Sequence, residues 1–278
     1  MTESSQSTNP SPLDSRYERY LRNVQYAQPD NLNARLRLHA KYSTSPISWF
    51  EWLHQQFSWS GVHDALDVGC GTGLFWSTLP RPLEEVRLVL ADISRSMIDL
   101  ATIAASPRVA RVRGVEANVQ GLPFEDSSFD AVIANHMLYH ASDPECAVAE
   151  IRRVLRPGGL LVASTIGPAH LRELVEIERT VLAAPRARVL GDVFGPVSGL
   201  APLERHFDAV QWRTFDDRLC CTDVEDVLAY ITSTPPGAHA TPEQLHGLRQ
   251  EIRRRMDRGR GVLDVVKEGG VFLARCST

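Results

Sequence analysis

The glycine-rich segment Asp67–Gly73 has the residue types and spacing of a ligand-binding turn. Its sequence is DVGCGTG, and it follows a short apolar run that is typical of a strand. Glycines in such a turn let the backbone pass close to a ligand and direct amide N–H groups toward it. A dinucleotide site needs its third glycine one residue later than Gly73, and no Lys-Ser or Lys-Thr pair follows. The spacing therefore favours neither a nicotinamide dinucleotide site nor a P-loop.

An acidic residue, Asp92, follows at the carboxyl end of the next predicted strand. A carboxylate at this position can accept hydrogen bonds from both hydroxyls of a ribose. The alternative is a helix N-cap, because residues 93–101 have a helical pattern. With the glycine turn in place we favour the ribose role, and we expect Ser94 to cap the helix.

The elements that must position these residues begin at Ala65, where short apolar runs start to alternate with helical periods. This alternation is typical of a parallel sheet flanked by helices. A helix before the fifth strand has Asp143 as its N-cap and ends at the RPGG segment, residues 156–159. Further helices are predicted over 166–182, 222–231 and 242–258. Strands are predicted at 65–69, 86–91, 111–115, 129–134, 160–164, 207–215 and 270–274.

Three regions are predicted along the chain. Residues 1–15 are rich in Ser, Thr, Asn and Pro, and we expect a disordered tail. Residues 16–60 are helical and aromatic, and we interpret them as an N-terminal lid. Residues 61–278 form the main α/β domain, with a helical insertion at about 222–260 before the last strand.

Composition bounds the class of protein. The 278 residues are 43% hydrophobic and 23% charged, with a net charge of -4, which is ordinary for a soluble globular protein and weighs against a nucleic-acid partner. We find no apolar run of membrane-spanning length and no secretion signal, so we expect a cytoplasmic protein with no membrane partner. The five cysteines lack metal-site spacing, so we predict no metal and small buried thiols, with Cys220 and Cys221 on opposite faces of a strand.

Four separately spaced motifs follow one another along the chain: DVGCGTG at 67–73, ADIS at 91–94, LPF at 122–124 before FD at 129–130, and LRPGG at 155–159. Together they resemble the class I S-adenosylmethionine-dependent methyltransferases, in the branch that often modifies natural products. The resemblance covers about residues 63–166, and residues 31–44 look like the N-terminal lid segment of small-molecule members. It implies a Rossmann-like methyltransferase fold, with a seven-stranded, mostly parallel sheet and an antiparallel last strand. It also implies S-adenosylmethionine as cofactor and S-adenosylhomocysteine as product.

The resemblance assigns roles at the methionine and ribose end of the cofactor. Asp92 would hold the ribose, and Asp67 would lie near the amino group, through water. Asn135 would offer its carbonyl to the ammonium, and Tyr42 would contact the carboxylate. The backbone of the turn would pack against the cofactor at Gly69, Cys70 and Gly71.

At the adenine end, the resemblance implies apolar contacts from Ile93 and Met97. Val119 would donate its backbone N–H to the ring. The family usually has Asp before LPF to bind the adenine amino group, whereas this chain has Asn118. The side-chain oxygen of Asn can accept the same hydrogen bond, so we keep the role.

Methyl transfer itself asks the protein mainly to align the acceptor and exclude water, so a catalytic residue is not required. The segment NHMLYH at 135–140 follows the fourth predicted strand, beside the expected methyl group. His136 and His140 are the candidates for a general base, since an unperturbed histidine has a pKa of about 6.5. The alternative is that they only shape the pocket or cap a helix.

Aromatic residues before and within the main domain are candidates for the acceptor site. Tyr17, Tyr20 and Tyr26 either pack in a core or form a lid over the acceptor, and Tyr139 is the candidate after strand four. An aromatic lining suits a planar or cationic acceptor.

We therefore predict methyl transfer from S-adenosylmethionine to an N, O or C nucleophile of a small metabolite in natural-product biosynthesis. An aromatic metabolite is one alternative. The alternatives are a protein of the same fold that catalyses a cyclisation or only binds, and an NAD-dependent oxidoreductase. Nucleic-acid methylation is disfavoured, because NHML stands where an NPPY-type motif would follow strand four. The sequence leaves the acceptor, the number of methyl groups and the choice between monomer and homo-oligomer open.

Overall fold

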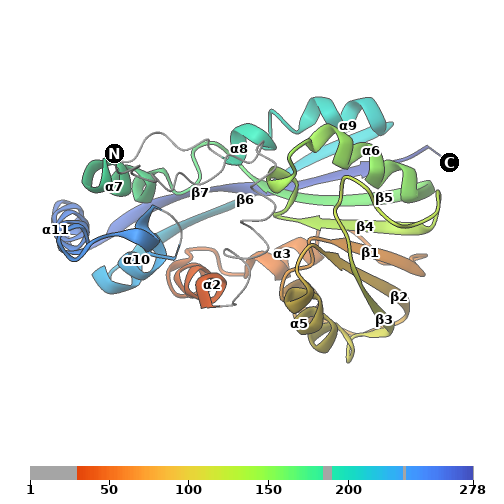
Figure 1. Ribbon diagram of the computed structural model, residues 1–278, viewed down its shortest axis with the longest axis horizontal. Coiled ribbons are helices and arrows are strands. Elements are labelled where there is room, and N and C mark those ends of the chain that lie inside the picture. Colours follow the sequence, from red (N-terminus) through yellow and green to blue (C-terminus); the bar gives the residue numbers. More distant parts are fainter. Residues whose placement is uncertain (1–29, 184–189, 234–235, 278) are drawn as a thin grey trace, which may run out of the picture.

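A seven-stranded sheet with helices on both faces organises residues 30–183, 190–233 and 236–277, which the computed structural model describes (Figure 1). The spatial order is β3-β2-β1-β4-β5-β7-β6. The first five strands run parallel, and β7 is antiparallel to both of its neighbours, which confirms the predicted sheet. The strands are β1 (Asp64–Val68), β2 (Leu83–Asp92), β3 (Val109–Glu116), β4 (Phe129–Asn135), β5 (Leu155–Ile166), β6 (Ala209–Cys221) and β7 (Leu263–Arg275).

The chain order reverses between β1 and β4, because β1 pairs with β2 on one side and with β4 on the other. In an open parallel sheet, such a reversal leaves a crevice at the carboxyl ends of the strands, where ligands bind. Four residues of β1 and five of β4 are buried, as expected for strands covered on both faces. The glycine turn leaves β1 at this crevice.

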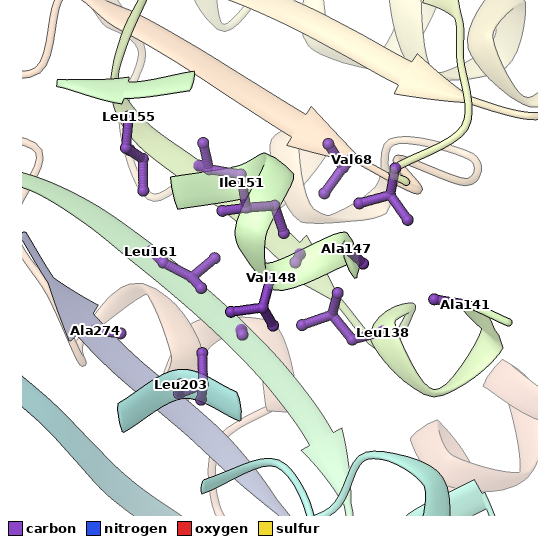
Figure 2. Close-up of a cluster of buried hydrophobic side chains, with 14 of the residues drawn as sticks. Val68, Leu138, Ala141, Ala147, Val148, Ile151, Leu155, Leu161, Leu203 and Ala274 are labelled. Carbon is purple, nitrogen blue, oxygen red and sulfur yellow. The ribbon is translucent and has the colours of Figure 1, made fainter. Parts of the chain in front are cut away.

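One face of the sheet is covered by α6 (Pro144–Val154) and α9 (Leu200–His206). Asp143 caps α6 as predicted, since its side chain accepts a hydrogen bond from the Cys146 amide. Figure 2 shows Val148 of α6 beside Leu161 of β5. This apolar packing holds α6 on the sheet, with the short helix η2 (Leu138–His140) at the edge of the crevice.

The opposite face carries three helices that bring the glycine turn and the N-terminal region together. A single core joins their apolar residues, Trp76 and Leu53 among them, to the strands. The helices are α3 (Trp49–His54), α4 (Leu74–Ser77) and α5 (Arg95–Ala105).

Long strands β6 and β7 extend past the parallel strands toward a separate group of helices (Figure 1). A third core, containing Leu38, Leu174, Leu228 and Leu248, fills this region. The helices of this group are α2 (Asp30–Tyr42), α7 (Arg172–Leu182), α10 (Val224–Ile231) and α11 (Pro242–Arg258), and α8 (Leu190–Val193) and η3 (Gly237–His239) lie between them in the sequence. Residues of α2 and α10 line the crevice.

Several predicted boundaries differ in the structure. The RPGG segment belongs to an irregular start of β5 rather than to the helix end, because pairing with β4 shifts register there. The helix predicted from 166 begins at Arg172, after Leu171 adopts a left-handed conformation with φ 54°. From Asp30 onward, where the structure describes it, the predicted lid region contains two helices, which are separated at residues 43–48. Strands β6 and β7 are much longer than predicted, because they pair with each other along their whole length.

The cysteines are all free, and Cys220 is exposed while Cys221 is buried, which confirms their opposite faces. The expectation of buried thiols is wrong for Cys220 and for the half-buried Cys146. Within the described ranges, no three His, Cys, Asp or Glu side chains are grouped to hold a metal ion. Every helix in that part of the chain is too short or too polar to cross a lipid bilayer.

Candidate functional site

A cavity of about 440 Å³ lies at the carboxyl ends of the parallel strands. One end is built from the glycine turn and the segments after β2 and β3. The other end is lined by side chains from α2, α3, β7 and the segment after β5. A ligand in this cavity would touch segments that lie far apart in the sequence.

The glycine turn needs its glycines for two reasons. Gly69 and Gly71 adopt φ values of +66° and +52°, which L side chains rarely adopt. A Cβ at Gly69 would also lie 2.7 Å from the Cβ of Met137. The backbone therefore passes tightly between β1 and the segment after β4, with Cys70 buried in the turn.

Asp92 ends β2 and orders two neighbouring segments. Its Oδ2 accepts a hydrogen bond from the Gly71 amide at 3.1 Å, and its Oδ1 accepts one from the Ser94 amide at 2.9 Å. Burial raises the pKa of this carboxyl, and the amide donors act against that rise. Ser94 occupies the N-cap position of α5, as expected, but its side chain makes no cap hydrogen bond; its Oγ lies 3.0 Å from that of Ser96.

Asp67 is the next-to-last residue of β1 and is only 2% exposed. Its Oδ2 accepts a hydrogen bond from Trp76 Nε1 at 2.7 Å, while its buried Oδ1 has no partner among the described residues. Burial raises the pKa of the carboxyl to about 7, and the Trp76 hydrogen bond opposes this. A buried, incompletely bonded carboxylate that lines a cavity is suited to a cationic group of a ligand.

The residues predicted for the adenine end also line the cavity. Ile93 and Met97 approach from the start of α5, and Asn118 and Val119 from the segment after β3. Asn118 Oδ1 accepts a hydrogen bond from the Gln120 amide at 2.9 Å. An amide oxygen has a second lone pair, so the predicted adenine contact is compatible with this turn.

The segment after β4 lies between the two ends of the cavity. Asn135 Oδ1 accepts a hydrogen bond from Ser164 Oγ, and the His136 amide donates to the Ser164 carbonyl at 3.1 Å. His136 has a φ of 53° and lies with its ring 4.9 Å from that of Trp49. A left-handed backbone conformation is unfavourable for a residue other than glycine, so the surrounding contacts must hold His136 in it.

The two histidine candidates for a general base both line the cavity, with Tyr139 between them. Burial lowers the pKa of His136 to about 4, and the charge of Lys267 contributes. Burial lowers the pKa of His140 to about 3, with a further contribution from Arg35. Both rings are therefore neutral near pH 7.

Tyr42 lies elsewhere, and the structure does not bring it to the cavity where the cofactor is predicted. It is 6% exposed, packs in the core between α2 and α10, and donates a hydrogen bond from its hydroxyl to Asp226 Oδ2 at 2.6 Å. It is not among the residues that line the cavity in the described part of the chain. Tyr17, Tyr20, Tyr26 and the predicted tail at 1–15 fall outside the described residues.

Sequence reasoning missed most of the cavity end opposite the glycine turn. Its polar residues come from α2, the segment after β5, α10 and β7, and no local motif marks them. Only the third core brings these elements together. The missed polar lining residues are Arg35, His39, His170, Tyr230 and Lys267.

Comparisons with known proteins agree with this geometry. Residues 66–163 match the family model described as "Methyltransferase domain". The malonyl-[acyl-carrier protein] O-methyltransferase of Hahella chejuensis is 40% identical over 111 residues, which are 40% of this chain and 39% of that protein. The ubiquinone/menaquinone biosynthesis C-methyltransferase UbiE of Pasteurella multocida is 38% identical over 134 residues, 45% of this chain and 49% of that protein. The chain thus aligns with less than half the length of either relative.

Solved structures show the same fold at low identity. A putative methyltransferase from Bacillus halodurans C-125 aligns with a TM-score of 0.57 and 19% identity, over 84% of this chain and all of that chain (100%). The [4+2]-cyclase SpnF aligns with a TM-score of 0.53 and 17% identity, over 97% of this chain and 98% of that chain. At these identities the likeness concerns the fold alone.

Proposed function

We propose, from the premise that residues 66–163 are a class I S-adenosylmethionine-dependent methyltransferase domain, that this protein transfers a methyl group to a small metabolite. The observation that carries the proposal is a pair of carboxyls at the glycine turn in one cavity, the buried Asp67 and the half-buried Asp92. S-adenosylmethionine has a ribose and an ammonium group, which these carboxyls suit. We further propose that the acceptor atom is an N, O or C nucleophile and that the reaction serves natural-product biosynthesis.

The residues present fit the cofactor. Asp92 would accept hydrogen bonds from the ribose hydroxyls, while the amides of Gly71 and Ser94 hold its carboxylate in place. Asp67 would offer its unpartnered Oδ1 to the ammonium, with the Asn135 carbonyl as a second acceptor. A turn without Cβ atoms at Gly69 and Gly71 leaves room for the backbone to pack on the ligand.

The adenine would lie between Ile93 and Met97, with its polar edge toward Asn118 and Val119. Gly73, the early third glycine, is the feature that separates this site from a dinucleotide site. The oxidoreductase alternative therefore has no support from this geometry.

When bound, the cofactor supplies an electrophilic methyl group on a sulfonium. The protein's part is to orient the acceptor, exclude water and, for a protonated nucleophile, accept a proton. His136 and His140 are neutral rings in the cavity wall, so each can form a hydrogen bond with the acceptor, and their lowered pKa values make them weaker bases than an ordinary histidine. Tyr139 is buried beside them and lines the same wall.

The test is calorimetric titration of the purified protein with S-adenosylhomocysteine, with NAD as the comparison ligand. We expect micromolar binding of S-adenosylhomocysteine, and Asp92→Ala should weaken it about tenfold or more, the effect of losing a hydrogen bond to a charged group. Asp99→Ala is the matched control, because Asp99 is an exposed carboxylate on α5 that pairs with Arg95 at 3.0 Å. Preference for NAD, or no binding of S-adenosylhomocysteine, would contradict the proposal.

Product analysis then separates a transferase from a cyclase of the same fold. A transferase converts S-adenosylmethionine to S-adenosylhomocysteine in proportion to acceptor consumed. If an acceptor is consumed while the cofactor stays intact, the protein binds the cofactor but catalyses another reaction.

A further inference from the structure

The cavity end opposite the glycine turn contains an unusual concentration of imidazole rings. His39 of α2 stacks on His170, which follows β5, with ring centroids 6.1 Å apart, and contacts Tyr230 of α10 at 6.0 Å. His136 faces Trp49 of α3 at 4.9 Å. We call this end the acceptor chamber and define it by His39, His136, His140, His170 and Lys267, all of which line the cavity.

Three of these rings have an unsatisfied polar atom. The Nδ1 atoms of His39, His136 and His170 are buried, and none has a hydrogen-bond partner among the described residues. Buried polar groups in folded proteins are almost always hydrogen-bonded, so three such atoms on residues that line one cavity point to a polar ligand there. Burial lowers the pKa of His39 to about 3 and that of His170 well below its usual range, so these rings are neutral.

Lys267 adds a positive charge and N–H hydrogen-bond donors to the chamber. It pairs with Asp217 across the β6–β7 register, and its ammonium donates a hydrogen bond to Asp217 Oδ2. Asp217 is held in turn by the amides of Thr44 and Ser45, at 2.9 and 3.0 Å. An ammonium has three N–H donors, and Asp217 is its one hydrogen-bond partner in the described part of the chain, so two donors are left for a ligand.

Charges are segregated along the cavity. Both carboxylates among its described lining residues, Asp67 and Asp92, lie at the glycine turn. The cations Lys267 and Arg35 both line the other end, where Lys267 adds to the lowered pKa of His136 and Arg35 to that of His140. A cationic acceptor would meet like charge in the chamber, whereas an anionic one would meet opposite charge and N–H donors.

We infer that the acceptor is a small organic acid, and that Lys267 determines this specificity by donating hydrogen bonds to its carboxylate. The inference rests on the proposed methyl transfer and narrows its acceptor class. Asp217 positions the ammonium, and the neutral histidines supply the remaining polar contacts around the acid. The aromatic rings of Trp49 and Tyr230 also line the cavity and suit contact with a flat apolar body.

The test compares benzoate with benzamide, which has nearly the same shape and no charge. Binding of each is measured by titration calorimetry or ligand-observed NMR, with the protein saturated in S-adenosylhomocysteine and again without it. We expect benzoate to bind at least about tenfold more tightly, equivalent to about 1.4 kcal/mol. Lys267→Met should abolish the preference, and Lys267→Arg should keep it.

A second variant guards against a folding defect, because Lys267→Met leaves the buried Asp217 carboxylate without its cation. The double variant Asp217→Asn/Lys267→Met removes both charges while an amide oxygen still faces the backbone donors. It should fold, bind S-adenosylhomocysteine like the parent and show no preference for benzoate.

Equal binding of the two probes, no binding of benzoate at millimolar concentration, or a preference that survives in the double variant would overturn the inference. A neutral hydroxylated acceptor is then the alternative. Failure of S-adenosylhomocysteine to bind is a separate result that contradicts the proposed function, while the benzoate preference without cofactor still reports on Lys267.

Discussion

Asp67 and Asp92 are two carboxyl groups that the protein holds in different ways at the same turn. Asp92 accepts hydrogen bonds from two backbone amides, whereas Asp67 accepts one from Trp76 and keeps Oδ1 unpartnered among the described residues. Burial raises both pKa values, that of Asp67 to about 7. Asp67 therefore changes its charge near neutral pH, at the place where an ammonium is expected.

This predicts a pH-dependent affinity for S-adenosylhomocysteine. Only ionised Asp67 attracts the ammonium, so the affinity should rise as pH increases through about 7. Titrations one pH unit below and above this value should differ several-fold in the parent. In Asp67→Asn, which can keep the Trp76 hydrogen bond, the affinity should be lower and nearly constant over the same range. A parent whose affinity does not change with pH would contradict this.

His136 illustrates a second effect of burial on a single residue. Its pKa is lowered to about 4, so the ring should remain neutral well below the midpoint of about 6.5 that an unperturbed histidine shows. We expect the Cε1–H resonance of His136, assigned by its loss in His136→Asn, to stay unchanged until the pH approaches about 4. A midpoint near 6.5 would show that the ring is solvated.

At the scale of elements, the close packing of α4 on α5 explains why a glycine is needed at position 73. It adopts φ +75° at the N-cap of α4, and a Cβ there would lie 2.6 Å from the Cα of Ala101 in α5. The glycine therefore allows α4 and α5 to pack against each other beside the glycine turn. A side chain would separate the two helices.

We predict that Gly73→Ala destabilises the fold by about 2–5 kcal/mol, from left-handed strain of about 1–2 kcal/mol plus overpacking of about 1–3 kcal/mol. Gly61→Ala is the matched control, because Gly61 has φ +77° but nothing within 4 Å of a Cβ. It should lose only the strain. Urea unfolding measures both variants, and equal losses would show that the contact with α5 is unimportant.

At the scale of the whole molecule, buried histidines link folding to pH. Five of them, His39, His54, His136, His140 and His170, have pKa values lowered by burial, four of these to between about 3 and 4. The unfolded chain protonates them near pH 6.5, so it binds more protons than the folded state as pH falls below that value. Three carboxyls, those of Asp67, Asp92 and Glu178, have raised pKa values. They favour the folded state as the pH falls, but they are fewer than the five histidines.

The free energy of unfolding should therefore decrease as the pH falls from about 6.5 toward 4.5. Each histidine contributes at most about 1.36 kcal/mol per pH unit. Urea unfolding at several pH values measures the slope, and His54→Gln, which lies outside the cavity lining, should reduce it by up to one such contribution. Stability that is constant or higher at pH 4.5 would contradict this balance.

Local pattern was sufficient for most of the sheet and for α6. The strands β1, β2 and β4 and the Asp143 cap lie where alternation and capping chemistry place them. Prediction was poorer for β7, where Lys267, Glu268 and two glycines interrupt the apolar run. Pairing with β6 over thirteen residues, Ala209 to Cys221, outweighs that weak local preference.

What the sequence by itself determined is the cofactor end of the cavity, since the residues from Asp67 to Asn135 that line it follow strand ends in short, regular motifs. The tertiary structure alone decided which distant residues join His136 and His140 in the acceptor chamber. His39, His170 and Lys267 belong to elements separated by roughly a hundred residues each. Their approach depends on the core that joins α2, α7, α10 and α11 to β6 and β7, and such long-range packing leaves no periodic trace along the chain.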